Sequence, residues 1–502
     1  MKLQYLTAIL LPFLFALNVS ADELPELGDI SQATISPRQE RQLGLQIMAE
    51  IRADRSYLDD PEIAAYLTGL GNRLLGGSNE DHPDQEFEFF ALQDPSINAF
   101  ALPGGFMGFN SGLILAAQSE SELAGVMSHE IAHVTQKHLA RMISGQKYGM
   151  LTTLASLALA ILVSRSNPQA GQAAATASQA LAIQSRLDFT RDHEKEADRI
   201  GLKILVNAGL DPNGMTEFFE RLQKAGRFQE NGAPSYLRTH PITYERIADI
   251  QNRTQNMPYR QVLDSPDFQL VRAKLRALQG KPKDAVRYFE SSIRDKRYNN
   301  EVAERYGLIN ALLRDRSYVR ADKELALLYE SSRADRLIEI LENHRLGSAI
   351  QIENKVSHSS PMIETLAARV KLSMGQSAEA LDIYRASLRI YPQHRALTYD
   401  YADALLRSHS AEAALKFINQ QLLFTPNDVR LYNLQAQGYA ALGSNLMQHR
   451  AQAEAYVRQG YLAAAIDQLQ TALRRNDGDF YQVSGVEARL KELRELAADN
   501  KN

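Results

Sequence analysis

Residues 129–133 of the chain read His129-Glu130-Ile131-Ala132-His133, and this stretch decides the fold of the first half of the sequence. On an α-helix, residues four positions apart lie on one face, so both imidazoles can reach one metal ion. Glu130 lies beside them, where it can act as a general base. Zinc accepts neutral imidazole and carboxylate ligands and, in catalytic sites, keeps a position for water. The motif therefore predicts a zinc-binding helix of a hydrolytic enzyme.

The sequence around this motif predicts a packed helix. Ser119 and Glu122 form a capping-box pattern at its start. An apolar face then runs along the helix, made of Leu123, Met127, Ile131 and Val134. Burying two histidines without a metal or a partner would be costly. The packing therefore favours a metal site over an amphipathic helix with two exposed histidines.

A second stretch, Glu194-Lys195-Glu196-Ala197-Asp198, offers a third ligand. Within a helix, Glu194 and Asp198 share a face and Glu196 points away from it. Glu194 can then bind the metal, and Asp198 can hold a ligating histidine through its other ring nitrogen. On spacing alone, the alternative of a solvated acidic surface turn stays open.

The segments on either side of the motif predict the rest of an α+β domain. Residues 87–90, 98–102 and 106–109 are typical of short strands, with a turn at residues 103–105, so we expect a small β-hairpin or sheet. Residues 150–163 are almost wholly apolar but too few to span a membrane. They favour a buried helix or a lid over the active site, within a lid-like segment at residues 143–185, over the alternative of a membrane anchor.

The second half of the chain shows an internal repeat. Ala380 and Ala414 lie 34 residues apart, as do Pro392 and Pro426. A period of 34 with small residues at fixed helix positions is typical of tetratricopeptide repeats, which stack into concave, peptide-binding arrays. The pattern extends in weaker form to Gly280 and Gly460 and degenerates across residues 300–355. We therefore expect an all-α solenoid over residues 263–502, after a mainly helical zincin-type metallopeptidase domain over residues 22–262.

The N-terminus and the composition indicate where the chain works. Lys2 precedes an apolar stretch at residues 6–17 and small residues at 19–21, which predicts a cleaved signal peptide over residues 1–21 and a periplasmic protein; an uncleaved anchor is the alternative. The 502 residues carry a net charge of -4, which gives no reason to expect nucleic acid as a partner. The sequence contains no cysteine, which excludes a thiol nucleophile and cysteine ligands for zinc.

The sequence also resembles a known family. HEIAH, then EKEAD followed by RIG, then Thr239-His240-Pro241, are similar to the motifs of the membrane-linked zincins that include the CAAX prenyl endopeptidases and the HtpX heat-shock protease. The resemblance implies that Glu194 is the third zinc ligand and that Asp198 supports the ligands. It also implies that the hairpin before the motif binds substrate along its edge strand.

The order of signal peptide, peptidase and repeats resembles that of periplasmic proteases of outer-membrane quality control. That resemblance implies degradation of unfolded or stalled outer-membrane β-barrel proteins and a chaperone role in their assembly. It also implies contact with the barrel-assembly machinery and the lipopolysaccharide-transport barrel through the repeats. Because residues 150–163 are too few to span a membrane, we expect peripheral rather than integral membrane association. His240 matches a loop histidine that fills the fourth zinc position and restrains activity; the alternative is a loop histidine that caps a helix before Pro241. Arg246 follows six residues later, and we expect it to stabilise the oxyanion. The rival interpretation is a tetratricopeptide chaperone or adaptor with a structural or latent zinc site.

Overall fold

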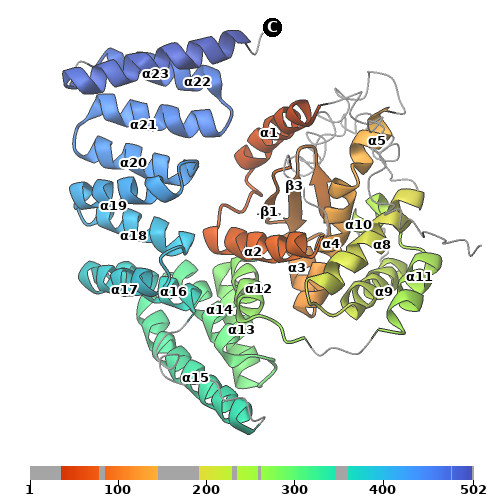
Figure 1. Cartoon of the computed structure of the whole chain (residues 1–502). Coiled ribbons are helices and arrows are strands. Elements are labelled where there is room, and N and C mark those ends of the chain that lie inside the picture. The colour runs from red at the N-terminus through yellow and green to blue at the C-terminus, as the bar shows by residue number, and fades with distance from the viewer. Residues whose placement is uncertain are drawn as a thin grey trace, which may run out of the picture.

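The structure is a computed structural model that describes residues 36–78, 85–144, 191–228, 235–257, 262–345, 360–475 and 477–499. The expected signal peptide, and the lid-like segment from residue 145 onward, lie outside these ranges. Among the helices that the structure describes, none combines the length and the apolar character that crossing a bilayer requires. The described chain is mainly helical with one small sheet (Figure 1), which confirms the predicted fold class.

The N-terminal part places a three-stranded sheet beside the motif helix. The sheet order is β1 (Glu88–Leu92), β3 (Phe106–Asn110) and β2 (Ala99–Leu102), with β1 parallel and β2 antiparallel to β3. The predicted hairpin is therefore the β2–β3 pair, and β2 lies at the edge of the sheet. The helices of this part are α1 (Pro37–Ala53), α2 (Pro61–Gly77), α3 (Ser111–Ala116), α4 (Glu120–Thr135) and α5 (His138–Ser144).

The motif helix α4 is buried along its whole length. The predicted apolar face is confirmed, since Leu123, Met127 and Ile131 are fully buried. Ser119 caps the helix by accepting a hydrogen bond from the backbone N–H of Glu122, but the Glu122 carboxylate does not return the bond. It binds Arg221 and the backbone N–H of Gln118 instead, so the predicted capping box is only half formed.

Four more helices belong to this part: α8 (Arg191–Asn207), α9 (Asn213–Phe228), α10 (Ser235–Thr239) and α11 (Tyr244–Thr254). Helices α8 and α9 pack directly against α4. The contact between α4 and α8 depends on Gly201, because a Cβ atom there would lie 3.0 Å from the backbone nitrogen of His129. Glycine lets the two backbones approach closely. The approach brings the start of α8, with Glu194 and Asp198, against the motif.

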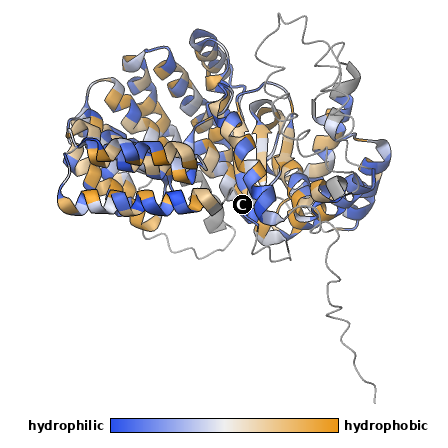
Figure 2. Ribbon diagram, turned by 90° about the horizontal axis from the view of Figure 1, so that it is seen from above, coloured by the Kyte–Doolittle hydropathy of each residue, from blue (hydrophilic) through white to orange (hydrophobic). Residues whose placement is uncertain are grey.

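The C-terminal half is a stack of antiparallel helix pairs, which confirms the predicted repeats (Figure 1). The pairs continue through residues 301–345, where the sequence pattern degenerates. Figure 2 shows apolar and polar residues on different sides of many of these helices, as amphipathic packing requires. The helices are α12 (Pro266–Leu278), α13 (Pro282–Arg294), α14 (Glu301–Arg314), α15 (Tyr318–Arg345), α16 (Pro361–Ser373), α17 (Ser377–Ile390), α18 (Arg395–Arg407), α19 (Ala411–Phe424), α20 (Val429–Ala441), α21 (Asn445–Arg458), α22 (Leu462–Leu473) and α23 (Phe480–Asp499).

The turn inside each pair repeats with the same period. Gly375 (φ 78°), His409 (φ 57°) and Gly443 (φ 72°) each have a positive φ angle in this turn, and each lies 34 positions after the one before it. All three adopt the left-handed conformation that ends the first helix of the pair. The backbone geometry thus keeps the period where His409 replaces the expected glycine.

The N-terminal end of α2 joins the two halves of the molecule. Glu62 has a fully buried side chain that forms an ion pair with Lys274 of α12 and accepts a hydrogen bond of 3.1 Å from the Tyr306 hydroxyl of α14. Asp60 lies 2.6 Å from the same Lys274 ammonium. Burial raises the pKa of Asp60, but Lys274 outweighs this effect and holds that pKa below its ordinary value. Lys274 therefore forms ion pairs with two carboxylates at the junction, and Arg369 Nη1 lies at a longer distance, 3.9 Å, from Glu62 Oε2.

We expect Lys274→Met to destabilise the full chain. The substitution leaves the Asp60 and Glu62 carboxylates without their shared cation, and removing one partner of a buried ion pair costs about 3–5 kcal/mol. Unfolding in denaturant should begin at clearly lower concentration than in the wild type. Lys224→Met is the matched control, because the Lys224 side chain is 70% exposed. Equal midpoints for the two variants would show that the junction does not stabilise the fold.

Candidate metal centre

Four buried side chains converge on one point between α4, α8 and the segment that follows α10. They are His129, His133, Glu194 and His240, and each offers a ligand atom within 4.8 Å of the other three. The Nε2 atoms of His129 and His133 lie 3.0 Å apart, and Glu194 Oε1 lies 3.4 Å from His133 Nε2. His240 Nδ1 is 2.9 Å from Glu194 Oε1. The sequence-based expectation brought together the same four residues.

Asp198 supports the first histidine from behind. Its Oδ1 atom lies 3.0 Å from His129 Nδ1, the ring nitrogen that faces away from the cluster. An imidazole that donates from Nδ1 to a carboxylate keeps its Nε2 lone pair for a metal. Asp198 therefore lies where the sequence placed it, at the outer nitrogen of a candidate ligand.

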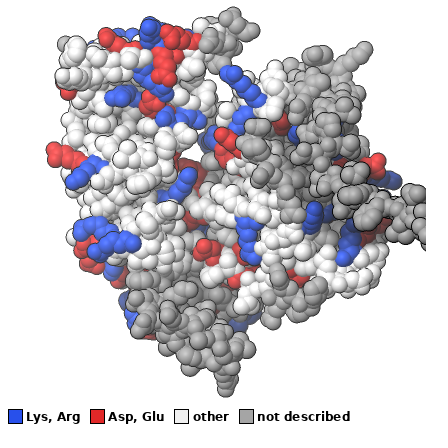
Figure 3. Space-filling view, in the orientation of Figure 1, with Lys and Arg blue, Asp and Glu red and all other residues white. Residues whose placement is uncertain are grey.

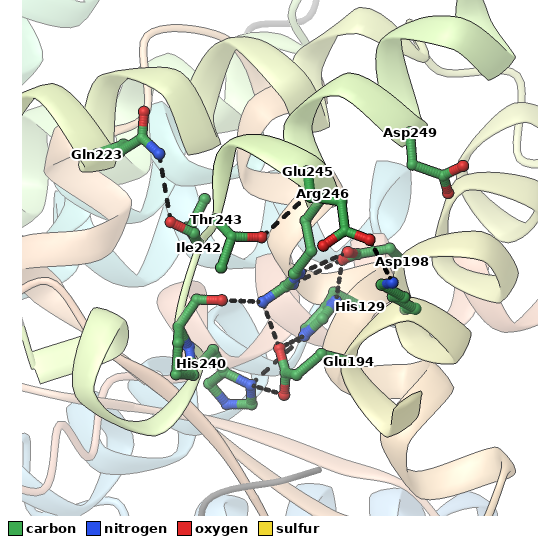
Figure 4. Close-up of polar contacts among 12 residues, drawn as sticks. His129, Glu194, Asp198, Gln223, His240, Ile242, Thr243, Glu245, Arg246 and Asp249 are labelled. Atoms are coloured by element: carbon green, nitrogen blue, oxygen red, sulfur yellow. Dashed lines mark hydrogen bonds and ion pairs between the residues drawn. The ribbon is translucent and has the colours of Figure 1, made fainter. Parts of the chain in front are cut away.

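Arg246 binds both acidic residues of α8 (Figure 4). Its Nε and Nη2 donate to the two carboxylate oxygens of Asp198, at 2.7 and 2.8 Å. Its Nη1 lies 2.6 Å from Glu194 Oε2 and donates to the backbone carbonyl of Pro241 at 2.8 Å. The expected oxyanion role of Arg246 stays a prediction. Reaching a substrate oxygen would compete with these bonds, whose evident effect is to hold Glu194 and Asp198 in place.

Glu130 has a buried carboxylate that forms no hydrogen bond with any residue the structure describes. The His240 ring lies beside it, with Nε2 3.6 Å from Glu130 Oε1. A buried carboxylate without hydrogen-bond donors is costly unless a ligand or water supplies them. The site therefore has an acceptor for a proton beside its cluster of metal-type ligands.

The electrostatic environment keeps the carboxylates ionised. Burial raises the pKa of Glu194, but His240, His129 and His133 together hold it well below its ordinary value. Burial also raises the pKa of Asp198, and hydrogen bonds from Arg246 and His129 bring it below its ordinary value. Charged carboxylates at neutral pH are the form that binds a metal cation.

The two motif histidines differ in their protonation. Burial lowers the pKa of His133 well below its ordinary value, so this ring is neutral at pH 7. Burial also lowers the pKa of His129, but hydrogen bonds with Asp198 and Glu194 outweigh it and raise the pKa to about 9. Because a metal ligand must be a neutral imidazole, metal binding at this site would release a proton from His129.

Two neighbours of the cluster were not singled out from the sequence. The buried ring of His138 has its Nδ1 2.9 Å from His133 Nδ1, and its Nε2 lies 3.1 Å from Glu196 Oε2. Burial lowers the pKa of His138 to about 4, so this ring is neutral at pH 7. Helical periodicity predicts that Glu196 points away from Glu194, and the structure agrees. On that side of the helix, the Glu196 carboxylate contacts His138.

The fold and the site together define a class of protein. A buried helix carries two histidines in i,i+4 spacing, and a second helix supplies a carboxylate. Beside them lies a glutamate whose oxygens form no hydrogen bond with the described residues. These donors fit a divalent metal of the zinc type, for which imidazole and carboxylate are the usual ligands in hydrolytic sites. The molecule is a metallopeptidase with an appended array of tetratricopeptide repeats.

Comparison with known proteins gives the family. A model of peptidase family M48 matches residues 61–254, and a tetratricopeptide-repeat model matches residues 371–438. The beta-barrel assembly-enhancing protease of Escherichia coli (strain K12) is 30% identical over 485 residues, which cover 95% of this chain and 92% of that protein. The chain therefore belongs to the M48 metallopeptidases, in the group of the beta-barrel assembly-enhancing proteases.

Two further relatives match parts of the chain. A putative beta-barrel assembly-enhancing protease of Vibrio cholerae is 41% identical over 253 residues, or 50% of this chain and 52% of that protein. The mitochondrial metalloendopeptidase OMA1 of Schizosaccharomyces pombe is 33% identical over 206 residues, or 41% of this chain and 57% of that protein. Parts of the chain are thus similar to a putative protease of a bacterium and to a mitochondrial protease.

Proposed function

We propose that this chain is a periplasmic zinc endopeptidase that degrades misassembled outer-membrane β-barrel proteins and assists the assembly of others. One observation carries the catalytic part of the proposal: four buried metal-type ligands converge within 4.8 Å beside a buried glutamate that forms no hydrogen bond within the described chain. The barrel substrates are proposed from the relatives, whose names state a role in β-barrel assembly.

We assign the ligands residue by residue. His129, His133 and Glu194 would hold the zinc ion, and His240 would fill the fourth position in the resting enzyme. When bound, zinc acts as a Lewis acid that polarises a peptide carbonyl and lowers the pKa of water to about 7. Glu130 would accept a proton through its carboxylate, whose oxygens form no hydrogen bond within the described part of the chain. Asp198 would keep the His129 ring in the orientation that points Nε2 at the cluster.

The sheet offers a place for the substrate backbone. Strand β2 pairs with β3 along one side only and lies at the edge of the sheet, and it packs beside the motif helix α4. An extended peptide can add to such an edge by main-chain hydrogen bonds. We propose that a strand of an unfolded barrel protein binds β2 in this way and so presents its peptide bonds to Glu130.

The repeats would bring the enzyme to its substrates. Tetratricopeptide arrays bind protein segments, and we propose the barrel-assembly machinery and the lipopolysaccharide-transport barrel as partners of residues 263–502. Figure 3 shows acidic and basic side chains scattered among uncharged ones over the described part of the surface that faces the viewer. Such a mixed surface suits contacts with proteins, and we propose peripheral rather than integral association with the membrane.

The direct test is incubation of an unfolded outer-membrane β-barrel protein with the purified, zinc-loaded mature chain. We expect the barrel protein to disappear with the release of internal fragments, which mass spectrometry would identify, and a zinc chelator should stop the reaction. The same barrel protein, already folded in detergent, is the matched control and should survive. Cleavage that continues in the presence of the chelator would overturn the proposal.

One observation favours a second candidate function. His240 brings the number of protein ligands in the cluster to four, and zinc sites closed by four protein ligands are structural as a rule. The chain would then be a tetratricopeptide chaperone or adaptor with a structural or latent zinc site. The incubation separates the two functions, because a chaperone would keep the barrel protein soluble and leave it intact.

The position of His240 makes a prediction of its own. If its ring occupies the fourth position, His240→Ala should raise basal proteolysis severalfold, because water can then take that position. The measurement is the initial rate of fragment release at equal zinc content. His449→Ala is the control, since His449 lies in the repeats and binds Gln468. A variant no faster than the wild type would show that His240 does not restrain the enzyme.

A further inference from the structure

His138 lies directly behind one of the proposed zinc ligands. It begins α5, its side chain is completely buried, and its Nδ1 atom is 2.9 Å from His133 Nδ1. His133 directs its other nitrogen, Nε2, into the cluster, 3.0 Å from His129 Nε2. His138 therefore contacts the ring nitrogen of His133 that would not bind the metal.

A turn with unusual backbone geometry creates this contact. In one continuous helix, residues five positions apart point about 140° away from each other, so His133 and His138 could not meet. Helix α4 ends at Thr135, and Lys137 follows in the left-handed conformation with φ 53°. A residue other than glycine is uncommon there. This turn directs α5 so that the His138 ring faces His133.

The chemistry of the contacts fixes the direction of each hydrogen bond. If His133 Nε2 gives its lone pair to the metal, its proton must lie on Nδ1, and His138 Nδ1 must accept it. The proton of a neutral His138 then lies on Nε2, which donates to Glu196 Oε2 at 3.1 Å. Arg141 Nη1 donates to the same oxygen at 3.0 Å and keeps Glu196 in place.

The arrangement parallels the support of the other motif histidine. Asp198 contacts His129 Nδ1 directly, at 3.0 Å. Glu196 acts on His133 in the same sense, but through the intervening His138 ring. The ring of His193 stacks on His138, with the centroids 4.5 Å apart and the planes 20° from parallel, and so limits tilting of the ring.

We propose that His138 is a positioning residue, which accepts a hydrogen bond from His133 Nδ1 and thereby fixes the tautomer and orientation of that ring for zinc. Glu196 fixes His138 in turn. The inference rests on the proposed zinc site, because it assigns Nε2 of His133 to the metal. Hydrogen-bonding partners of this kind typically contribute 10–100-fold to metal affinity.

The test compares two substitutions of nearly equal size. In His138→Asn, the side-chain carbonyl replaces Nδ1 as acceptor, whereas His138→Leu has no acceptor. Zinc affinity of the full mature chain is measured by competition with a chelating dye. We expect His138→Leu to bind zinc about 10–100-fold more weakly than the wild type and His138→Asn to keep most of the affinity.

A third variant guards against a folding defect. Glu196→Ala changes a side chain that is 28% exposed, so the fold should survive, and we expect a smaller loss of zinc affinity. Wild-type affinity in both His138 variants would overturn the inference, as would equal losses in the two with unchanged thermal unfolding. If the His133→Ala variant binds zinc as tightly as the wild type, the proposed zinc site itself is wrong. That outcome differs from the loss of the His138 inference alone.

Discussion

Glu130→Gln should reduce the rate of peptide cleavage by about 10²–10⁴-fold, which is the usual contribution of a general acid or base. The amide keeps the size of the side chain but cannot accept a proton from water. Because the Glu130 oxygens form no hydrogen bond within the described chain, the substitution leaves an existing network intact. We therefore expect zinc content and thermal stability near those of the wild type. The measurement is fragment release from an unfolded barrel protein at saturating substrate.

The control for this variant is Glu412→Gln, which changes an exposed residue of α19 in the repeats. It should cleave at the wild-type rate. Glu130→Gln should still bind unfolded barrel proteins, since the proposed edge-strand contact lies on β2. A Glu130→Gln enzyme that retains more than about a tenth of the wild-type rate would exclude Glu130 as the base.

His133→Ala should abolish both zinc binding and proteolysis. The substitution removes one of the two i,i+4 imidazoles, and its effect should exceed the 10–100-fold loss typical of a residue that only supports a ligand. Elemental analysis of the purified variant should find almost no zinc, whereas we expect a single ion per chain in the wild type. Proteolysis should fall below detection.

Two comparisons make the result specific. His449→Ala removes a histidine of the repeats, so it should retain both zinc and activity. Chelation of the wild type followed by addition of zinc should restore cleavage, whereas the same treatment of His133→Ala should not. A His133→Ala chain that holds zinc as firmly as the wild type would place the metal elsewhere in the protein.

The candidate ligands were predictable because local spacing encodes most of their geometry. The four-residue interval places His129 and His133 on one face of a helix, and the same interval places Glu194 and Asp198 on one face of another. The close approach of the two helices cannot be read from the local sequence pattern. It depends on Gly201, whose lack of a side chain allows α8 to lie against the backbone of His129.

The supporting residues were harder to predict for a physical reason. The contact between His138 and His133 depends on the left-handed backbone of Lys137, and a helical pattern continued through this turn predicts that the rings diverge. The buried ion pair between Glu62 and Lys274 joins two residues that lie 212 positions apart in the sequence. No periodicity connects such positions. The fold class and the repeats, in contrast, follow from patterns that recur along the chain.

The most direct test of the account is anomalous diffraction at the zinc absorption edge from crystals of the zinc-loaded mature chain. We predict a single strong peak about 2.0–2.2 Å from Nε2 of His129, Nε2 of His133 and a carboxylate oxygen of Glu194. Such a peak would place the metal beside Glu130, where the proposed mechanism requires it. A peak at other residues, or no peak in crystals shown to contain zinc, would contradict the account.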